Sequence, residues 1–398
     1  MDITISPRLL GGELNIIPSK SQAHRYLICA AFADRPTELI CPEVNEDIEA
    51  TADCLRALGA QVERTVDGYR IAPISDIPQK AVLHCRESGS TLRFLLPVAG
   101  ALGVETTFVM DGRLPQRPLS PLWEEMERMG CQLTRPSENT IACTGKLRPG
   151  HFSIDGSVSS QYITGLLFAL SIMDSPNKLT VTGKIESKPY IEITKAAMKA
   201  FGVDPDHSEN QTYRSPGTIT VEADWSNGAF WVAARQLGNP IQVEGLNPHS
   251  PQGDRVAEWY LQTIANAPEA PVIQVSDIPD LVPIMAVVAA AGKGLVMHDI
   301  RRLRLKESDR VASTLSMIEN LGGKAKADEN TMQIYGTGLK GGTVDACNDH
   351  RIAMAAAIAA TVCTEPVTIL GAECVKKSYP GFWDAYKTLG GVYEQHLR

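Results

Sequence analysis

The chain has 398 residues, 43% of them hydrophobic, which is enough material for two separate cores. Its 38 basic and 46 acidic side chains give a net charge of −8, which argues against a broad nucleic-acid-binding face. No apolar run approaches the roughly 18 residues that span a bilayer. We therefore expect neither a nucleic-acid partner nor a membrane partner.

The N-terminal segment and the cysteines indicate a reducing compartment. Residues Met1–Pro7 lack the basic-then-apolar pattern of a secretory signal. The nine cysteines are an odd number and include no Cys-x-x-Cys pair, so neither a disulfide framework nor a zinc site is indicated. We expect most of them to be small buried hydrophobes. The sequence thus predicts a cytoplasmic protein with no metal and no other cofactor.

A weak repeat runs along the chain from its first quarter to its end. In each copy an amphipathic helix stops at a hydrophobic-Gly pair, and a strand, a polar turn and a second strand follow. Glycine at the stop is what a left-handed helix C-cap requires. The interval between the third and fourth stops is about twice the others, which predicts a degenerate sixth copy near Val256–Asn266. The five clearer copies are Ala50–Ile71, Leu122–Ala142, Ile191–Val221, Val311–Ile334 and Phe382–Glu394.

Alternation of helices with strands favours layered α/β domains over a solenoid or a propeller. Six units divide into two groups of three, with chain crossings near Pro18–Lys20 and Ala223–Trp225. We expect one discontinuous domain, residues 1–18 plus 225–398, and one inserted domain, residues 19–224. The alternative is chance recurrence of a common helix-Gly-strand pattern.

Short cationic segments are scattered along this acidic chain. Each places Lys or Arg beside hydroxyl or glycine residues, a chemistry that suits phosphate and carboxylate groups. Such segments indicate a pocket for small, multiply charged anions. They are Ser19–Arg25, Ser88–Arg93, Arg113–Pro118, Lys306–Arg310 and Asn348–Arg351.

Each segment also has an ordinary structural interpretation. Ser21 is a candidate helix N-cap, and so is Asp280, which precedes the apolar stretch Leu281–Ala291. The four charges of Lys306–Arg310, at the expected start of a helix, could form a solvated face. Ser159-Ser160-Gln161, before the apolar helix expected over Tyr162–Ile172, could be a plain cap or a phosphate cradle.

Taken in order, these segments resemble the enolpyruvyl transferase family of 5-enolpyruvylshikimate-3-phosphate (EPSP) synthases, from Gly11-Gly12 to Lys377–Pro380. Asp155–Gln161, Ser187–Ile191 and Asp277–Asp280 match as well. The resemblance implies two similar domains, each of three βαβαββ units in an inside-out α/β barrel, closing on a central cleft. It also implies a monomer, with the inserted domain on the shikimate 3-phosphate side and the discontinuous domain on the phosphoenolpyruvate side.

The activity that the resemblance implies is transfer of the enolpyruvyl group of phosphoenolpyruvate to the 5-hydroxyl of shikimate 3-phosphate, with release of phosphate. That reaction belongs to the shikimate pathway to chorismate and the aromatic amino acids. The implied contacts to shikimate 3-phosphate are Lys20, Ser21, Arg25, Ser159, Ser160, Gln161, Ser187, Tyr190, Asp280 and Lys306. The implied contacts to phosphoenolpyruvate are Lys20, Gly89, Arg93, Arg117, Gln161, Arg310, Arg351 and Lys377.

The implied catalytic residues are Asp280, Glu307 and Lys20. One group must protonate the methylene carbon and another must accept the hydroxyl proton. We assign donation to Glu307 and acceptance to Asp280, and we expect crowding and burial to raise the pKa of Glu307. We expect Asp309 to be structural, pairing with an arginine, and His350 to be a hydrogen-bonding neighbour of the site.

Three positions depart from the family pattern. Glu87 stands where Asn is usual, Ser90 where Thr is common and Arg302 where Asn is frequent. The carboxylate of Glu87 would repel an anion unless Arg86 or Arg93 neutralises it. Gly89, in contrast, matches, and family enzymes bind the inhibitor glyphosate beside this glycine in the place of phosphoenolpyruvate.

Two other functions stay open at this point. The sister enzyme that uses UDP-N-acetylglucosamine has the same architecture, but it usually carries a reactive Cys in the loop corresponding to Asp111–Ser120, where this chain has none. A non-catalytic protein that only binds phosphoenolpyruvate is the second alternative. Retention of both Asp280 and Glu307 argues against it.

Overall fold

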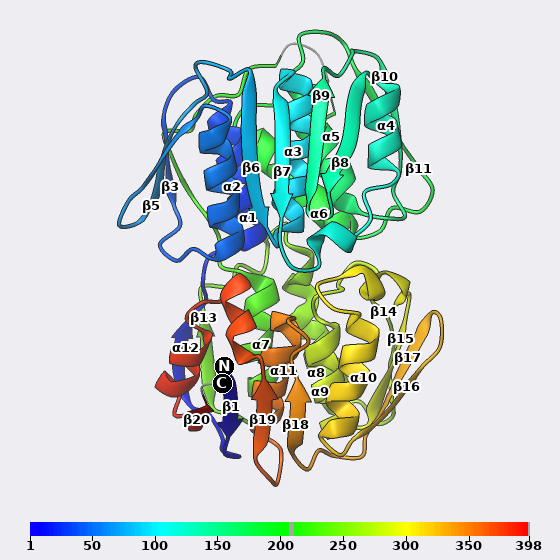
Figure 1. Ribbon diagram of the computed structural model, residues 1–398. Helices are drawn as coiled ribbons and strands as arrows, with labels where there is room; N and C mark the ends of the chain where they lie inside the picture. The colour runs from blue at the N-terminus through cyan, green and yellow to red at the C-terminus, as the bar shows by residue number, and fades with distance from the viewer. Residues whose placement is uncertain (207–210, 397–398) are drawn as a thin grey trace. The chain divides into compact units, whose positions relative to one another are not determined.

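The computed structural model describes residues 1–206 and 211–396. Clustering of contacts divides the chain into two compact units, each with its own hydrophobic core. Unit 1 comprises Met1–Ile17 and Glu222–Arg398, and unit 2 comprises Pro18–Val221 (Figure 1). Both units are mixed α/β, as the repeat pattern predicted.

Unit 2 contains three repeats. The first holds α1 (Lys20–Ala31), β3 (Thr37–Ile40), α2 (Glu46–Ala57), β4 (Gln61–Arg64) and β5 (Gly68–Ala72). The second holds β6 (Lys80–Arg86), α3 (Gly89–Leu102), β7 (Glu105–Met110), α4 (Leu122–Arg128), β8 (Cys131–Ser137) and β9 (Thr140–Gly145). The third holds β10 (His151–Asp155), α5 (Ser160–Ser171), β11 (Lys178–Thr182), α6 (Lys188–Ala200) and β12 (Thr218–Thr220).

Unit 1 also contains three repeats, and the N-terminal strands complete two of them. The first holds β2 (Gly12–Asn15), α7 (Trp225–Gln236), β13 (Ile241–Glu244) and α8 (Ala257–Asn266). The second holds β14 (Val272–Gln274), α9 (Val282–Ala291), β15 (Gly294–His298), α10 (Arg310–Asn320), β16 (Lys324–Ala327) and β17 (Thr331–Tyr335). The third holds β18 (Gly342–Asp345), α11 (His350–Ala359), β19 (Val367–Leu370), α12 (Phe382–Thr388), β20 (Tyr393–His396) and β1 (Asp2–Ile5).

Four sheets share one topology. Their orders are β12-β3-β5-β4, β6-β7-β9-β8, β14-β15-β17-β16 and β18-β19-β1-β20. In each, the first two strands are parallel and the third runs antiparallel to the second. In the second sheet, for example, Phe108 of β7 lies opposite Leu83 on one side and Ile141 on the other. In the second and third of these sheets a crossover helix followed by a hairpin produces this order, whereas β12 joins the first sheet from the end of unit 2 and β1 joins the fourth from the N-terminus.

Each repeat contributes one interior helix and one covering helix. The interior helices α1, α3, α5, α7, α9 and α11 are buried along almost their whole length, and helices that are apolar all round belong in a core. The other helix of each repeat buries fewer of its residues. Figure 1 shows α3 behind the sheet of β6 and β7, and α11 behind β18 and β19.

The predicted helix stops are confirmed. Gly59, Gly130, Gly202, Gly322 and Gly390 all have positive φ, between 74° and 114°. The degenerate copy is also confirmed as a helix, because α8 spans Ala257–Asn266.

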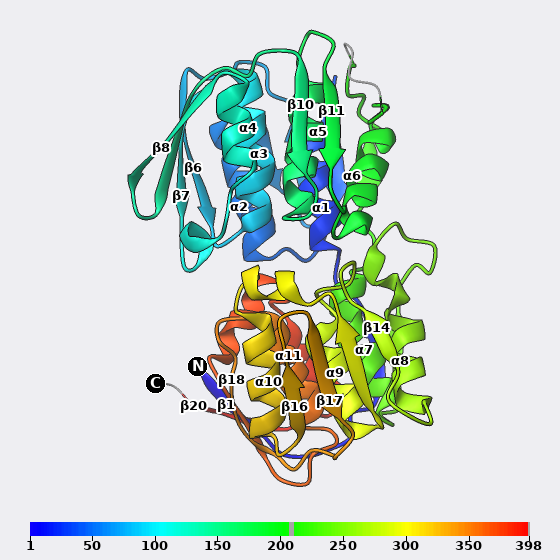
Figure 2. The same ribbon diagram turned by 90° about the vertical axis from the view of Figure 1, so that its right-hand side faces the viewer.

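One prediction about the repeats was wrong. The copy at Ile191–Val221 was expected to end in a strand pair, but its described residues contain a single strand, β12, which joins β3 of the first repeat. Residues 207–210 of that copy lie outside the described residues. Among the described residues β10 therefore pairs with β11 alone, and Figure 2 shows these two strands side by side. The sheet β13-β2 also has two described strands, while the other four sheets have four.

Across residues 1–206 and 211–396, no helix is both long and apolar enough to cross a membrane.

Candidate functional site

In unit 2, the guanidinium groups of Arg93 and Arg117 lie beside Gly89, the first residue of α3, which has no side chain. A Cβ atom at Gly89 would lie 2.8 Å from Nη1 of Arg117 and 2.9 Å from Nη1 of Arg93. Arg93 itself donates to Oε1 of Gln161 at 2.7 Å and to the carbonyl of Pro118 at 3.1 Å. Two cations beside a residue without a side chain can approach the oxygens of one carboxylate or phosphate closely.

The N-terminus of α5 lies next to this pair. Gln161 links the two helices, since its Nε2 donates to the Ser90 hydroxyl at 3.0 Å while its Oε1 accepts from Arg93. Ser159 caps the helix by accepting from the backbone N–H of Gln161 at 3.2 Å. The helix starts at Ser160, two residues before the expected Tyr162. Two hydroxyls at a helix N-terminus suit a phosphate group.

Arg25 joins α1 to α6 from a buried position. It donates to the Ser21 carbonyl at 2.6 Å, to the Thr194 hydroxyl at 2.8 Å and to the Tyr190 carbonyl at 3.0 Å. Its guanidinium lies over the Phe94 ring, 4.9 Å from the centroid. Burial lowers the pKa of Arg25 to about 9, so the group is still a cation at neutral pH. Ser21 and Tyr190 are thereby held beside a fixed positive charge.

Lys20 and Ser187 stand at the starts of α1 and α6. Lys20 donates to Asp47 at 2.9 Å, and both side chains are 16% exposed. The N-cap of α1 is Ser19 and not Ser21, so the cap expected at Ser21 was placed two residues too late. Ser187 is buried in the left-handed region, with φ of 54°, immediately before α6.

The candidate residues of unit 1 gather around Arg310, which is 1% exposed. Its guanidinium donates to Asp280 at 2.7 Å, to Glu307 at 2.8 Å and to Asp349 at 3.0 Å. Burial alone would lower the pKa of Arg310, but the three carboxylates outweigh it and raise that pKa above its usual range. One buried cation thus fixes the positions of three acids.

Asp280 is surrounded by cations. Besides Arg310, it has Arg351 Nη2 at 3.4 Å and Lys306 Nζ at 3.8 Å from its carboxylate oxygens. Burial would raise the pKa of Asp280, yet Lys306, Arg351 and Arg310 together hold it well below its usual range. Burial lowers the pKa of Lys306 to about 8, partly offset by Asp280. The cluster therefore pairs an ionised acid with a lysine that loses its proton unusually easily.

Arg351 and Lys377 complete the unit 1 cluster. Arg351 donates to Asn227 Oδ1 at 3.2 Å and lies over the Phe230 ring at 5.8 Å. Lys377 donates to the Asn348 carbonyl at 3.0 Å, which places it beside the start of α11. Both side chains are buried, so their charge faces a restricted space and not open solvent.

Several local expectations need correction. Asp280 does not cap α9, because that helix begins at Val282 after Leu281 and has no side-chain cap. The segment Lys306–Arg310 does not open a helix either, since α10 begins only at Arg310. Asp309 is its N-cap, and it lies 3.8 Å from Arg304, which confirms the expected structural role and arginine partner.

The carboxyl group of Glu87, one of the departures from the family pattern, packs against the turn at Gly112. Of the two arginines considered as its partners, Arg86 donates to Asp53 at 2.8 Å, and Arg93 donates to Gln161 and Pro118.

Sequence reasoning missed the partners that hold the candidate residues. Asp47 pairs with Lys20, Asn227 with Arg351, and Asp349 with Arg310. Asp349 also accepts from Ser308 at 2.9 Å. Asp254 is a further buried acid bonded to Ser226, and burial together with the nearby Asp280 raises its pKa to about 7. Polar residues at helix starts were the one available signal for Asp349 and Asn227.

The structure thus brings the candidate residues together in two clusters, one in each unit. Unit 2 holds Lys20, Ser21, Arg25, Gly89, Arg93, Arg117, Ser159, Ser160, Gln161, Ser187 and Tyr190. Unit 1 holds Asp280, Lys306, Glu307, Arg310, Arg351 and Lys377. Within the described ranges, no group of three or more His, Cys, Asp or Glu side chains could hold a metal ion.

Comparison with known proteins identifies the family. The profile described as "EPSP synthase (3-phosphoshikimate 1-carboxyvinyltransferase)" matches residues 5–386. The chain belongs to the EPSP synthase family. Curated relatives named 3-phosphoshikimate 1-carboxyvinyltransferase include one from Clostridium kluyveri, 38% identical over 99% of this chain and 98% of its own length. Another, from Clostridium novyi, is 36% identical over the same shares.

Solved structures show the same fold. EPSP synthase from Acinetobacter baumannii superposes with a TM-score of 0.80 at 21% identity, covering 99% of this chain and all of that one. The enolpyruvyl transferase NikO from Streptomyces tendae gives a TM-score of 0.74 at 15% identity, covering 100% and 99%. The alignment with the C. kluyveri relative runs over 419 positions, more than the 398 residues here, so that relative contains segments this chain lacks.

The lowered pKa of Lys306 can be tested directly. Competitive labelling with acetic anhydride, read by mass spectrometry across pH 6–11, should place the half-point of Lys306 reactivity near pH 8. In the denatured protein the same lysine should titrate near the ordinary value of about 10.4. Because Asp280 opposes the shift, Asp280→Asn should move the half-point lower still. A half-point near 10 in the folded protein would contradict the buried position of this ammonium group.

Proposed function

We propose that the protein transfers the enolpyruvyl group of phosphoenolpyruvate to the 5-hydroxyl of shikimate 3-phosphate and releases phosphate. This is the reaction of its family in the shikimate pathway, which leads to chorismate and the aromatic amino acids. Membership of the family along residues 5–386 is the observation that carries the proposal. The two clusters, rich in cations for phosphate and carboxylate, support it.

Shikimate 3-phosphate is proposed to bind mainly to the inserted domain, residues 19–224. Ser160 and Gln161 at the start of α5 would hold the 3-phosphate together with Arg25, whose charge survives burial. The hydroxyls of Ser21, Ser159, Ser187 and Tyr190 would complete the set, with Lys20, Asp280 and Lys306 near the sugar-like ring.

Phosphoenolpyruvate is proposed to use the arginines that flank Gly89 and those around Asp280. Arg93 and Arg117 offer two guanidinium forks next to a glycine, which leaves room for an oxyanion. Arg310, Arg351 and Lys377, assisted by Lys20 and Gln161, would neutralise the remaining negative charge. The discontinuous domain, residues 1–18 plus 225–398, would supply those last three cations.

The first chemical step adds the hydroxyl across the enol double bond. The 5-hydroxyl oxygen forms a bond to C2 of phosphoenolpyruvate, its proton passes to Asp280, and Glu307 protonates C3. Asp280 suits acceptance because its surroundings keep it ionised. Glu307 is paired with Arg310, an arrangement that favours a charged carboxylate. An anionic group of phosphoenolpyruvate competing for Arg310 would release Glu307 to carry a proton.

The second step collapses the tetrahedral intermediate. The new methyl group returns one proton to Glu307, the electrons of that C–H bond form the C=C bond, and the C–O bond to phosphate breaks, which forms the enol ether product. The departing phosphate takes the hydroxyl proton from Asp280. Cations stabilise the departing phosphate. Lys20 is proposed to assist proton movement, and its pair with Asp47 would keep its ammonium group in place. We propose that a single chain performs this in the cytoplasm without a metal or other cofactor.

Release of inorganic phosphate tests the proposed activity. Phosphate should appear when shikimate 3-phosphate and phosphoenolpyruvate are present together and not with either alone. UDP-N-acetylglucosamine in place of shikimate 3-phosphate should give none, because the loop over Asp111–Ser120 has no cysteine. Release with the sugar nucleotide alone as acceptor would assign the protein to the sister activity instead.

Glu307→Gln separates chemistry from binding. The amide keeps the hydrogen bond geometry beside Arg310 but cannot donate an acidic proton, so kcat should fall about a hundredfold or more. The KM for shikimate 3-phosphate should change little. Glu319→Gln, at an exposed position on α10, the helix that follows Glu307, is the matched control and should retain full activity. Near-normal turnover of the Glu307 variant would make this residue structural.

Gly89→Ala probes the phosphoenolpyruvate position with glyphosate, which we expect to compete with that substrate. The added Cβ would meet the mobile ends of Arg93 and Arg117, so folding should tolerate it while the anion site is crowded. The inhibition constant for glyphosate should rise more than the KM for phosphoenolpyruvate, because the inhibitor is the longer molecule.

The matched control for this variant is Gly11→Ala. Its new Cβ would contact only Pro240, at an ordinary 3.4 Å, and inhibition should stay at the wild-type level. Equal inhibition of the wild type and Gly89→Ala would show that Gly89 does not line this site.

A further inference from the structure

Among its described residues, the third repeat of unit 2 has no counterpart of a strand that its two sister repeats have. In those repeats an antiparallel strand, β5 or β9, pairs with the second parallel strand, β3 or β7. β11 occupies the equivalent place in the third repeat, and among the described residues it pairs only with β10. Apolar surface that a hairpin covers elsewhere is therefore left beside β11.

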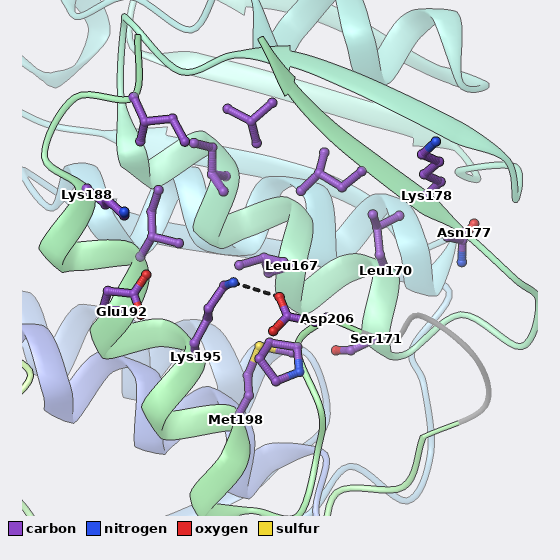
Figure 3. Close-up of a pocket in the computed structure, with 16 residues that line it drawn as sticks. Leu167, Leu170, Ser171, Asn177, Lys178, Lys188, Glu192, Lys195, Met198 and Asp206 are labelled. Atoms are coloured by element: carbon purple, nitrogen blue, oxygen red, sulfur yellow. Dashed lines mark hydrogen bonds and ion pairs between the residues drawn. The ribbon is translucent and has the colours of Figure 1, made fainter. Parts of the chain in front are cut away.

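A cavity of about 440 Å³ lies at this place, between β11, α5 and α6. Leu167 and Leu170 of α5, Leu179 and Val181 of β11 and Met198 of α6 are among its apolar walls. Figure 3 shows Leu167, Leu170 and Met198 among the side chains around this space. The volume falls within the roughly 300–1,000 Å³ that small-molecule pockets occupy.

One lysine crosses this apolar space. The stem of Lys195, on α6, runs past Leu167, and its Nζ ends 2.7 Å from Asp206 (Figure 3). Lys195 is 28% exposed and Asp206 is 62% exposed. An ion pair so open to water contributes little to stability, so another carboxylate can replace Asp206.

The remaining charges at the cavity favour an anion. Lys178 and Lys188 line it at opposite ends, and Glu192 is the one other acid among its lining residues. With Lys195 and Asp206 included, three ammonium groups face two carboxylates. A ligand that brings a negative charge next to Lys195 and an apolar body over Leu167 matches both features.

We propose that this cavity is a second ligand site, which binds a small amphipathic carboxylate. The aliphatic or aromatic body would fill the space that a hairpin takes in the sister repeats, and the carboxylate would contact Lys195 beside or in place of Asp206. The site is separate from the substrate clusters, so it stands whether or not the proposed reaction is correct.

Three probes with one apolar body and different head groups test the proposal by titration calorimetry. They are 3-phenylpropanoate, 3-phenylpropan-1-ol and 3-phenylpropylamine, added to the full-length protein. The carboxylate should bind at least about tenfold more tightly than the alcohol or the amine, since only it can pair with Lys195. Equal affinities would mean non-specific apolar binding, and no binding by the carboxylate would overturn the proposal.

Two single-residue variants should change the affinity for 3-phenylpropanoate in opposite directions. Lys195→Met should weaken 3-phenylpropanoate binding by about tenfold, because the charge is lost while the stem is kept. Asp206→Asn should strengthen it, because the competing carboxylate disappears. If both variants bound the probe like the wild type, its carboxylate would not lie at Lys195 and the proposal would fail.

Filling the cavity is the steric test. Leu167 is half-buried, so Leu167→Trp should fold, abolish probe binding and leave turnover unchanged. If circular dichroism shows that the Trp variant is unfolded, Leu167→Phe serves in its place.

The titration of the full-length protein with 3-phenylpropanoate is then repeated in the presence of saturating shikimate 3-phosphate. Undiminished probe binding supports a separate site, and loss of probe binding would place the probe at the substrate cluster and overturn the proposal.

Discussion

Arg310 is the group on which the unit 1 cluster depends. A guanidinium that is 1% exposed must be compensated, and Asp280, Glu307 and Asp349 do so together. Removal of one partner from a buried ion pair typically costs about 3–5 kcal/mol, because a charge is left without compensation. The same contacts decide the chemistry. In the proposed reaction they hold the two acids Asp280 and Glu307 within reach of one cation, and an anionic substrate that engaged this cation would change the surroundings of both.

The fold presents these groups through its interior helices. The candidate residues and their partners cluster at the N-termini of all six interior helices, where unpaired backbone N–H groups and the helix dipole favour anions. The residues at those starts are Lys20 for α1, Gly89 for α3, Ser160 for α5, Asn227 for α7, Asp280 for α9 and Arg351 for α11. A repeat that places one buried helix start in every copy thus collects, in each unit, three places suited to an anion. The side chains at each of these helix starts then determine whether it binds an anion or takes part in a reaction.

Local sequence patterns predicted much of the fold and part of the candidate site. They failed to predict the contacts between residues that are far apart in the sequence. The glycine stops and the order of helices and strands follow from short stretches of sequence, and so does the proximity of Gly89 to Arg93. The pairing of Lys20 with Asp47 and of Arg351 with Asn227 joins residues 27 and 124 positions apart, which no spacing rule connects. Helix starts were misplaced at Asp280 and Lys306 because charge was taken as a cap signal, whereas local 3₁₀ and turn geometry delays α9 and α10.

The sheets β10-β11 and β13-β2 have no hairpin among the described residues, which indicates that the hairpin is the dispensable part of a repeat. A hairpin adds two strands at one edge of a sheet, whereas the candidate residues lie at or near the starts of interior helices. The third and fourth repeats therefore keep Ser160 at α5 and Asn227 at α7 although their sheets have two strands. The core loses burial where the hairpin is absent. Leu179 and Val181 of β11 are half-buried, whereas Phe108 of β7 is completely buried. Apolar surface that stays exposed in this way does not stabilise the fold. Covering it would contribute about 25 cal/mol of stabilising free energy per Å² buried. Ser160 and Asn227 thus keep their places at helix starts in repeats without a described hairpin, and in unit 2 a cavity lies beside β11, where we propose that a ligand supplies the missing burial.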